Sequence, residues 1–169
     1  MRAAFLSTAF IIAAVMFQNH ATAAGLAKGS PAPAFTLKDL AGNSISLEEQ
    51  KGRVILLYFW STQCAPCTAE MPSLKKLYAA FKNKDFEIIA VSIDPSARPV
   101  KEFALLNYIG FTLLLDPDKK VSSDLYACSS LPMSYLIDQR GTIIDTFIGA
   151  RQWNTMDLKK KIRRLLDKK

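Results

Sequence analysis

The amino-acid sequence predicts an α/β fold in which a central mixed sheet is flanked by helices. Three apolar segments suited to buried strands, residues 53–60, 86–93 and 111–116, alternate with helical patterns. That alternation favours parallel pairing through right-handed crossovers. Two later strand patterns, residues 133–137 and 142–148, flank a tight-turn signal and therefore add an antiparallel hairpin. A chain of 169 residues without an internal repeat or a linker suits one domain.

The chain before the first long strand predicts a separate short hairpin. Residues 35–37 and 44–47 flank the turn-rich run DLAGN. The next segment, RVILLYFW at residues 53–60, is almost continuously apolar and rich in β-favouring side chains. This character is typical of a central strand that is buried on both faces. The segment FEIIAVSI at residues 86–93 repeats it and predicts the second long strand.

Helical periodicity marks the segments between the strands. The first helix is expected to begin near Cys64, because apolar side chains recur at helical spacing after it. Pro99 is placed to open a second helix that runs to about Tyr108. A short helix is expected within PDKKVSSDLYA, residues 117–127. The last helix is expected to run from Asn154, as its N-cap, to Leu166. Its expected buried stripe is Leu158, Ile162, Leu165 and Leu166.

The N-terminus has the pattern of an export signal. Arg2 precedes the uncharged apolar stretch Ala3–Phe17 of 15 residues, and the small residues of Ala21–Ala23 follow. We therefore expect a signal peptide over residues 1–23, a mature domain over residues 24–169, and a periplasmic or otherwise extracytoplasmic location. The alternative is an uncleaved membrane anchor, but 15 apolar residues are short of the roughly 20 that a span needs.

Removal of residues 1–23 limits the chemistry of the mature chain. The only histidine, His20, is lost, which excludes a histidine metal site, a Ser-His triad and a Cys-His nucleophile pair. Without Arg2, 21 basic residues face 15 acidic ones, a net charge of +6. The basic residues are dispersed along the chain and are densest in the last helix. We therefore expect no nucleic-acid partner and attribute most of the charge to solvated helix faces.

The pair Cys64 and Cys67 stands where a buried strand gives way to a helix. Cysteines three apart in the first helical turn bring their sulfurs within reach of a disulfide, and the helix terminus favours a thiolate. A zinc site would need two more nitrogen or sulfur ligands, and only Cys128 and carboxylates remain. A structural staple would close a very short loop with little entropic gain. A redox centre is the favoured interpretation, and no cofactor or metal is expected.

Longer stretches of the sequence resemble the thioredoxin superfamily and, within it, the TlpA/ResA-type exported thiol-disulfide oxidoreductases. The resemblance covers most of the mature chain. It rests on the opening SPAPAFTLKDLAGNSISLEEQKGRVILLYFWSTQCAPCTAEMPSL, on FEIIAVSID, on SSLPMSYLID and on GTIIDTFIG. A CxxC motif with a Leu-Pro before a strand about 65 residues later is specific as a pair. The resemblance implies a thioredoxin fold with an added N-terminal β-hairpin.

The resemblance also implies roles for individual residues. Cys64 matches the nucleophile and Cys67 the resolving thiol. Pro132 matches the cis-proline that packs against the disulfide, where neighbouring backbone would pair with an extended substrate. Glu70 matches an acidic residue that some members place close to the cysteines. Pro72 matches a proline that kinks the active-site helix, for which a purely structural effect is preferred.

Two positions depart from the family pattern. Gln63 stands where the family usually has tryptophan, which removes apolar cover beside the first cysteine. Cys128 stands where an apolar residue is more common, and we expect it to act as a small buried hydrophobe, with a regulatory or partner-linking thiol as the alternative. Trp60 and Trp153 are interpreted as packing residues.

The function expected from this resemblance is that of a protein-disulfide oxidoreductase of the cell envelope. Family membership favours a reductant in cytochrome c maturation or cysteine rescue, with protein disulfides or apocytochrome-like substrates and a membrane-embedded thiol donor as partners. Two alternatives stay open. A peroxide-reducing relative would set its cysteine beside Thr and Arg, which this motif lacks. A binding module could instead hold copper(I) between Cys64 and Cys67. The sequence leaves the oligomeric state undetermined.

Overall fold

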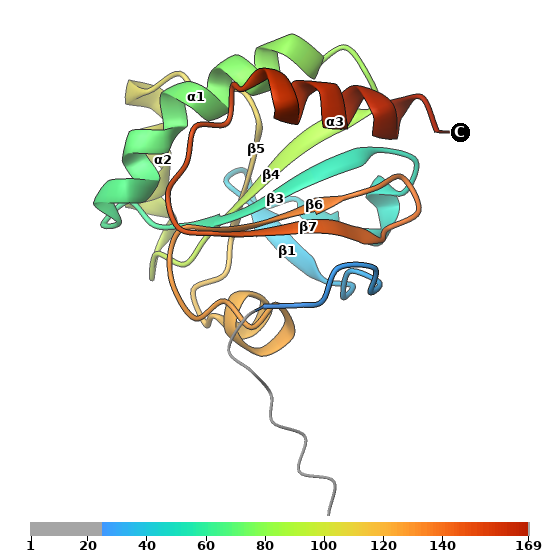
Figure 1. Cartoon of the computed structure of the whole chain (residues 1–169). Coiled ribbons are helices and arrows are strands. Elements are labelled where there is room, and N and C mark those ends of the chain that lie inside the picture. Colours follow the sequence, from blue (N-terminus) through green and yellow to red (C-terminus); the bar gives the residue numbers. More distant parts are fainter. Residues whose placement is uncertain (1–24, 169) are drawn as a thin grey trace, which may run out of the picture.

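Seven strands within residues 25–168, the part of the chain that the computed structural model describes, form one mixed sheet (Figure 1). The strands are β1 (Thr36–Asp39), β2 (Ser44–Ser46), β3 (Val54–Trp60), β4 (Phe86–Ser92), β5 (Thr112–Leu115), β6 (Met133–Ile137) and β7 (Ile143–Ile148). Their order across the sheet is β2-β1-β5-β4-β3-β6-β7. The predicted export signal at residues 1–23 lies outside the described residues.

The pairing directions follow the expectation from the sequence. Strands β3, β4 and β5 are parallel, because a helix returns the chain between them. The hairpin of β6 and β7 and the N-terminal hairpin of β1 and β2 are antiparallel, and they join the sheet through β3 and β5. The expected mixed sheet with an added N-terminal hairpin is confirmed.

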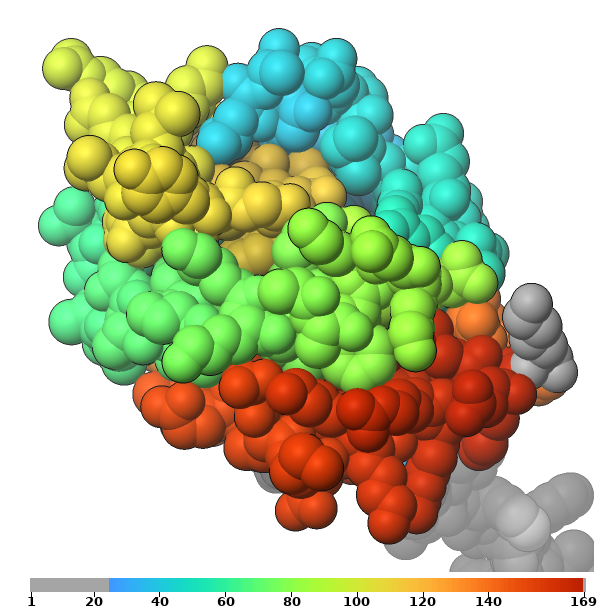
Figure 2. Space-filling view, turned by 90° about the horizontal axis from the view of Figure 1, so that it is seen from above, coloured from blue at the N-terminus to red at the C-terminus, as the bar shows by residue number. Residues whose placement is uncertain are grey.

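Three helices cover one face of the sheet. They are α1 (Ala65–Phe81), α2 (Ala97–Leu106) and α3 (Met156–Leu166). Figure 2 shows α1 between α2 and α3 on this face. The opposite face carries η2 (Lys120–Leu125) and the N-terminal segment, while the short η1 (Glu48–Gln50) follows β2 (Figure 1). None of the described helices combines the length and the apolar character needed to cross a membrane.

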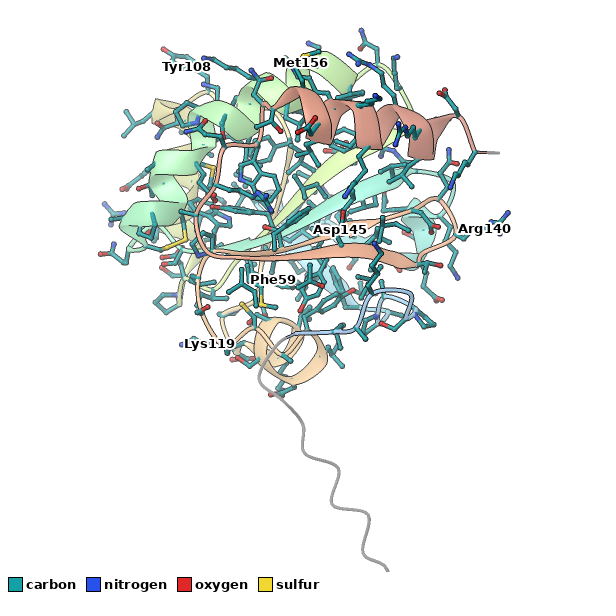
Figure 3. All side chains as sticks on the ribbon, viewed as in Figure 1. Phe59, Tyr108, Lys119, Arg140, Asp145 and Met156 are labelled. Atoms are coloured by element: carbon teal, nitrogen blue, oxygen red, sulfur yellow. A yellow bond between two sulfur atoms is a disulfide. The ribbon has the colours of Figure 1, made fainter. Side chains whose placement is uncertain are left out.

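The two faces of the sheet carry two separate cores, because successive side chains of β3 point to opposite faces. Val54, Leu56, Tyr58 and Trp60 pack against the helices, whereas Ile55, Leu57 and Phe59 join the core under η2. Figure 3 shows Phe59 on the η2 side of the sheet and Tyr108 at the outer helical layer. The strand is buried on both faces, as its continuous apolar run predicted. Tyr58 is thereby aimed at the helical layer.

Three helix boundaries differ from the prediction. Helix α2 begins two residues earlier, at Ala97, so Pro99 lies within its first turn, where backbone N–H groups have no helical partner anyway. The helix ends at Leu106, and Tyr108 already has a left-handed backbone (φ 50°). The N-cap of α3 is Thr155 instead of Asn154, because the Thr155 hydroxyl accepts the Leu158 N–H at 3.4 Å.

The buried stripe of α3 is narrower than expected. Ile162 and Leu165 are buried, whereas Leu158 and Leu166 are half-buried at the edge of the core. The spacing of the four apolar residues predicts that they share one face of the helix. Because α3 lies at the margin of the helical layer, only part of that face is covered by the rest of the protein.

Candidate active site

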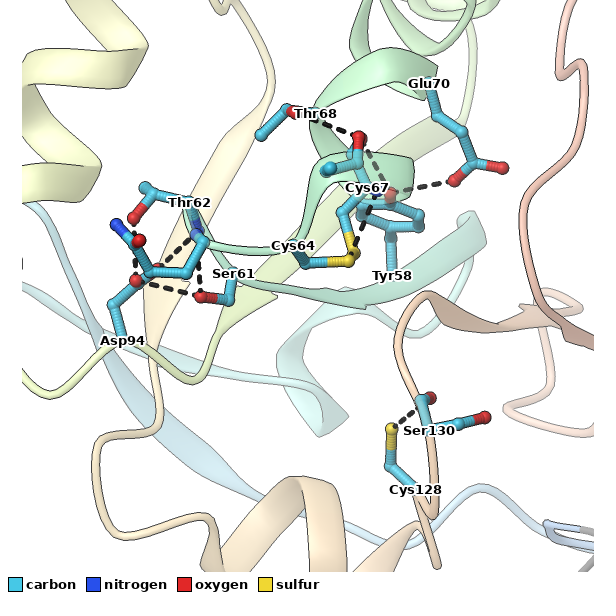
Figure 4. Close-up of a disulfide and its surroundings, with 12 residues drawn as sticks. Tyr58, Ser61, Thr62, Cys64, Cys67, Thr68, Glu70, Asp94, Cys128 and Ser130 are labelled. Carbon is cyan, nitrogen blue, oxygen red and sulfur yellow. Dashed lines mark hydrogen bonds between the residues drawn. A yellow bond between two sulfur atoms is a disulfide. The ribbon is translucent and has the colours of Figure 1, made fainter.

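Cys64 and Cys67 form a disulfide at the point where β3 gives way to α1 (Figure 4). Their Cα atoms lie 5.2 Å apart, within the usual disulfide range. Cys64 is the N-cap of α1, and its Sγ accepts the Cys67 N–H at 3.3 Å. The proline at the second helical position, Pro66, has no N–H to lose in this turn. The motif thus places sulfur where a helix terminus stabilises negative charge.

The two sulfur-bearing residues differ in exposure. Cys64 is half-buried at the rim of the core, whereas Cys67 is fully buried. Thiol-disulfide exchange needs an accessible thiolate that attacks a disulfide sulfur, followed by a second thiol that displaces it. Of these two residues, Cys64 is therefore the more accessible to a partner.

Asp94 anchors the loop that leads into Cys64. Its carboxylate, buried after the end of β4, accepts hydrogen bonds from the Ser61 hydroxyl at 3.0 Å and from the Ser92 hydroxyl at 2.6 Å. It also accepts from the backbone N–H and the hydroxyl of Thr62, at 2.9 and 2.8 Å (Figure 4). Burial opposes the charge, but these hydrogen bonds outweigh it and hold the pKa of Asp94 below its ordinary value. The residues before Cys64 are therefore fixed to the neighbouring strand.

Glu70 is buried one helical turn after Cys67. One carboxylate oxygen accepts a hydrogen bond from the Tyr58 hydroxyl at 2.8 Å, and the other accepts from the backbone N–H of Arg151. The expected carboxylate beside the cysteine turn is present, and it also ties α1 to the segment between β7 and α3.

Pro132 lies at the same end of the central strands as the cysteine loop. The Leu131–Pro132 bond is cis, as the resemblance implied. The next residue, Met133, pairs with Phe59 near the end of β3, and the Pro132 carbonyl accepts the Gly149 N–H at 2.9 Å. Pro132 itself is buried. The β6–β7 hairpin therefore presents its proline next to the strand end from which the cysteine loop departs.

Comparisons with known proteins agree with this geometry. Residues 28–146 match the AhpC/TSA family. A thiol-disulfide oxidoreductase ResA from Bacillus cereus is 38% identical over 121 residues, which cover 72% of this chain and 69% of that protein. The thioredoxin-like protein YneN from Bacillus subtilis is 36% identical over 138 residues, covering 80% and 79% of the two chains.

The chain belongs to the AhpC/TSA family, among its thiol-disulfide oxidoreductases. A solved structure from Chlorobium tepidum, assigned as a thiol:disulfide interchange protein DsbE, superimposes with a TM-score of 0.76 at 30% identity. That match covers 83% of this chain and 99% of the Chlorobium protein. The thioredoxin fold and the oxidoreductase class expected from the sequence are therefore confirmed.

Cys128 of this oxidoreductase is not the fully buried hydrophobe that the sequence predicted. It is half-buried and lines a hollow of about 320 Å³ together with Ser122, Ser130 and Leu131. Its Sγ donates to the Ser130 carbonyl at 3.4 Å (Figure 4). Burial raises the pKa of the Cys128 thiol to about 11, so the thiol stays protonated at neutral pH. Cys128 is only half-buried because the segment before Pro132 crosses the surface instead of entering the core.

Two tryptophans and two residues of the cysteine segment were also singled out in the sequence. Trp60 and Trp153 are buried, as expected of packing residues. Gln63 is exposed beside the disulfide, and Pro72 is exposed inside α1. No cluster of three or more potential metal ligands occurs among residues 25–168.

Sequence reasoning missed three contributors to the site: Tyr58, Asp94 and the backbone of Arg151. Tyr58 was available as the one hydroxyl in the otherwise apolar β3, and Asp94 as the acid two residues after the end of β4. The Arg151 contact had no signal in the sequence, because a backbone N–H belongs to every residue except proline.

Proposed function

We propose that this chain is a cell-envelope reductant of protein disulfides in which Cys64 attacks and Cys67 resolves. The observation that carries the proposal is the unequal exposure of the two cysteines at the start of α1. The Cys64 thiolate attacks one substrate sulfur, and the substrate disulfide breaks to a mixed disulfide and one substrate thiolate. Cys67 then attacks Cys64 and releases the second substrate thiolate. Two electrons pass to the substrate, and the protein is left with the Cys64–Cys67 disulfide.

The backbone of the residues next to Pro132 is the proposed partner of the substrate backbone. The β6–β7 hairpin brings Pro132 to the sheet edge beside the cysteine loop, so an extended peptide laid against it would reach Cys64. The exposed Gln63 would face that peptide in place of the tryptophan usual in the family. A polar side chain there favours hydrogen bonding to the peptide over apolar cover.

The direction of electron flow is proposed from the charges around the disulfide. The intervening Ala65-Pro66 provides no cation and no side-chain donor to a Cys64 thiolate. Glu70 is buried and takes part in none of the ion pairs formed among residues 25–168, and a negative charge on its carboxylate would act against a neighbouring thiolate. Only the helix terminus favours the thiolate, by typically about 0.3–1 kcal/mol. A poorly stabilised reduced form makes a reductant.

The reduction potential tests this direction. We expect a value nearer to the roughly −270 mV of thioredoxin than to the roughly −120 mV of a strong oxidant. The purified protein is equilibrated with a series of dithiothreitol or glutathione buffers, and the reduced fraction is measured by thiol labelling. A value close to that of the oxidant overturns the assignment and favours disulfide donation.

The same preparations distinguish two other roles for the cysteines. Tight one-to-one binding of copper(I) against a competing chelator, without turnover of a disulfide substrate, would identify a metal carrier. Rapid catalytic consumption of hydrogen peroxide would favour the peroxide-reducing alternative. The proposed reductant shows neither of these as its main activity.

The proposed partners are apocytochrome-like or other protein disulfides and a membrane-embedded thiol donor that restores the dithiol. Relatives named ResA, together with the ResA-type motifs of this chain, support a role in cytochrome c maturation. Both partners require export, which the pattern of residues 1–23 supports. We expect the mature protein to begin at Ala24, and intact-mass measurement of protein from the cell envelope checks this. Retention of Arg2 would identify a membrane anchor.

A further inference from the structure

Tyr58 of β3 contacts both Glu70 and the backbone of Cys67 in the redox site. Its side chain is fully buried in β3 and points toward α1. The hydroxyl oxygen lies 2.8 Å from a carboxylate oxygen of Glu70 and 3.1 Å from the Cys67 carbonyl oxygen (Figure 4). A single phenol group thus contacts both the acid and the backbone of the resolving cysteine.

The hydroxyl has one proton and two acceptors. Burial, reinforced by the negative charge of Glu70, raises the pKa of Tyr58 far above its usual range, so the phenol keeps its proton. While Glu70 is ionised, the shorter and charge-assisted bond to Glu70 takes that proton. Once Glu70 is protonated, its own O–H donates to the Tyr58 oxygen, and the phenol proton is free to turn to the Cys67 carbonyl.

The charged and titratable groups that contact Glu70 are few. Tyr58 approaches from β3, and Arg151 approaches from the segment before α3 through its backbone N–H. The guanidinium of Arg151 lies over the rings of Phe147 and Trp153, with its carbon 4.1 and 5.3 Å from their centroids. Cys67 lies one turn earlier on α1 itself. Among these groups, Tyr58 is the only side chain that donates a hydrogen bond to Glu70.

We propose that Tyr58 is a positioning residue of the redox site that holds the Glu70 carboxylate in place and links it to the helical turn of Cys67. The proposal rests on the proposed function, since it assigns Tyr58 a part in the chemistry of the Cys64–Cys67 pair. A buried carboxylate that loses one of two donors becomes a weaker acid. Because interacting groups titrate together, the thiols of the reduced protein respond as well.

The test compares Tyr58→Phe with Tyr126→Phe. Both substitutions remove only a hydroxyl from a buried tyrosine, but Tyr126 donates to the Pro33 carbonyl in the core on the other face of the sheet. Carbon-13 NMR of labelled glutamate follows each carboxyl group against pH, and the Glu70 signal is assigned by its absence in Glu70→Gln. We expect Tyr58→Phe to raise the Glu70 midpoint by at least one pH unit, a tenfold weaker acid, and Tyr126→Phe to leave it unchanged.

Thiolate absorbance of the reduced proteins supplies a readout that a packing role would not move. Glu70→Gln is expected to form thiolate at lower pH, because a negative charge beside the thiols is removed. Tyr58→Phe is expected to shift the thiolate midpoint as well, because the Glu70 carboxylate loses the donor that holds it, and Tyr58→Phe added to Glu70→Gln is expected to change nothing more. This non-additivity is the signature of residues that act through one another.

Two results overturn the proposal: a Glu70 midpoint in Tyr58→Phe equal to that in Tyr126→Phe, or fully additive thiolate shifts. Should Tyr58→Phe fail to fold, 3-fluorotyrosine at position 58 is a stronger donor and is expected to lower the Glu70 midpoint instead. The carboxyl titration does not require turnover. A protein that exchanges no disulfides therefore refutes the proposed function, while the NMR comparison still decides whether Tyr58 controls Glu70.

Discussion

Cys67→Ser is expected to trap the protein in covalent mixed disulfides with its substrates. The half-buried Cys64 can still attack a substrate disulfide, but the buried thiol that would displace the substrate is gone. Turnover should fall to the background rate of exchange. Non-reducing electrophoresis of cell-envelope extracts, followed by mass spectrometry of the trapped species, detects the complexes and identifies the substrate proteins.

Cys64→Ser provides the matched control. It should lose turnover equally but trap nothing, because its remaining motif thiol is buried. Both variants are made in a Cys128→Ser background, since Cys128 is half-buried and could otherwise form adventitious disulfides. Equal trapping by the two variants would contradict the assignment of attacking and resolving roles.

Trp153→Ala is expected to lower the free energy of unfolding by about 3–5 kcal/mol. The indole is 1% exposed, with ring centroids 6.2 Å from Tyr58 and 5.4 Å from Phe147. Its backbone N–H donates to the Ser73 hydroxyl at 3.2 Å, which anchors the segment between β7 and α3 onto α1. Truncation leaves a large cavity under the segment whose Arg151 N–H binds Glu70. Guanidinium unfolding followed by circular dichroism measures the loss.

Met156→Ala is the control in the same part of the chain. Met156 is 73% exposed at the start of α3, so its truncation should change the free energy of unfolding by no more than about 0.5 kcal/mol. A loss for Trp153→Ala within the range of this control would show that the indole contributes little to the core.

Much of the fold follows from local pattern alone. The continuous apolar run of β3 predicted a strand buried on both faces, because a central strand that is covered on both faces of the sheet has no face for polar residues. The helix boundaries were less predictable. Pro99 was expected to be the first residue of α2, but it is the third. A proline is tolerated anywhere in the first turn, because the N–H groups of that turn have no helical partner.

The redox pair was also readable from the sequence. Cys64 and Cys67 are neighbours along the chain, and the geometry of one helical turn brings their sulfurs together whatever surrounds them. Pro132 lies far along the chain from them and was placed only through the family resemblance. Cys128 shows the limit of that reasoning: residue type predicted burial, but the path of the loop before Pro132 left the thiol at the surface.

The sequence by itself determined the strands, the helices, their alternation and the cysteine motif, because each depends on contacts within about one turn or along one strand. The tertiary structure decided which polar groups surround that motif. Asp94 reaches the Cys64 loop from the neighbouring strand, Tyr58 reaches Glu70 from beneath the helix, and the Arg151 backbone reaches it from 81 residues away. A buried carboxylate needs donors wherever the fold can supply them, and only the packed chain determines which residues those are.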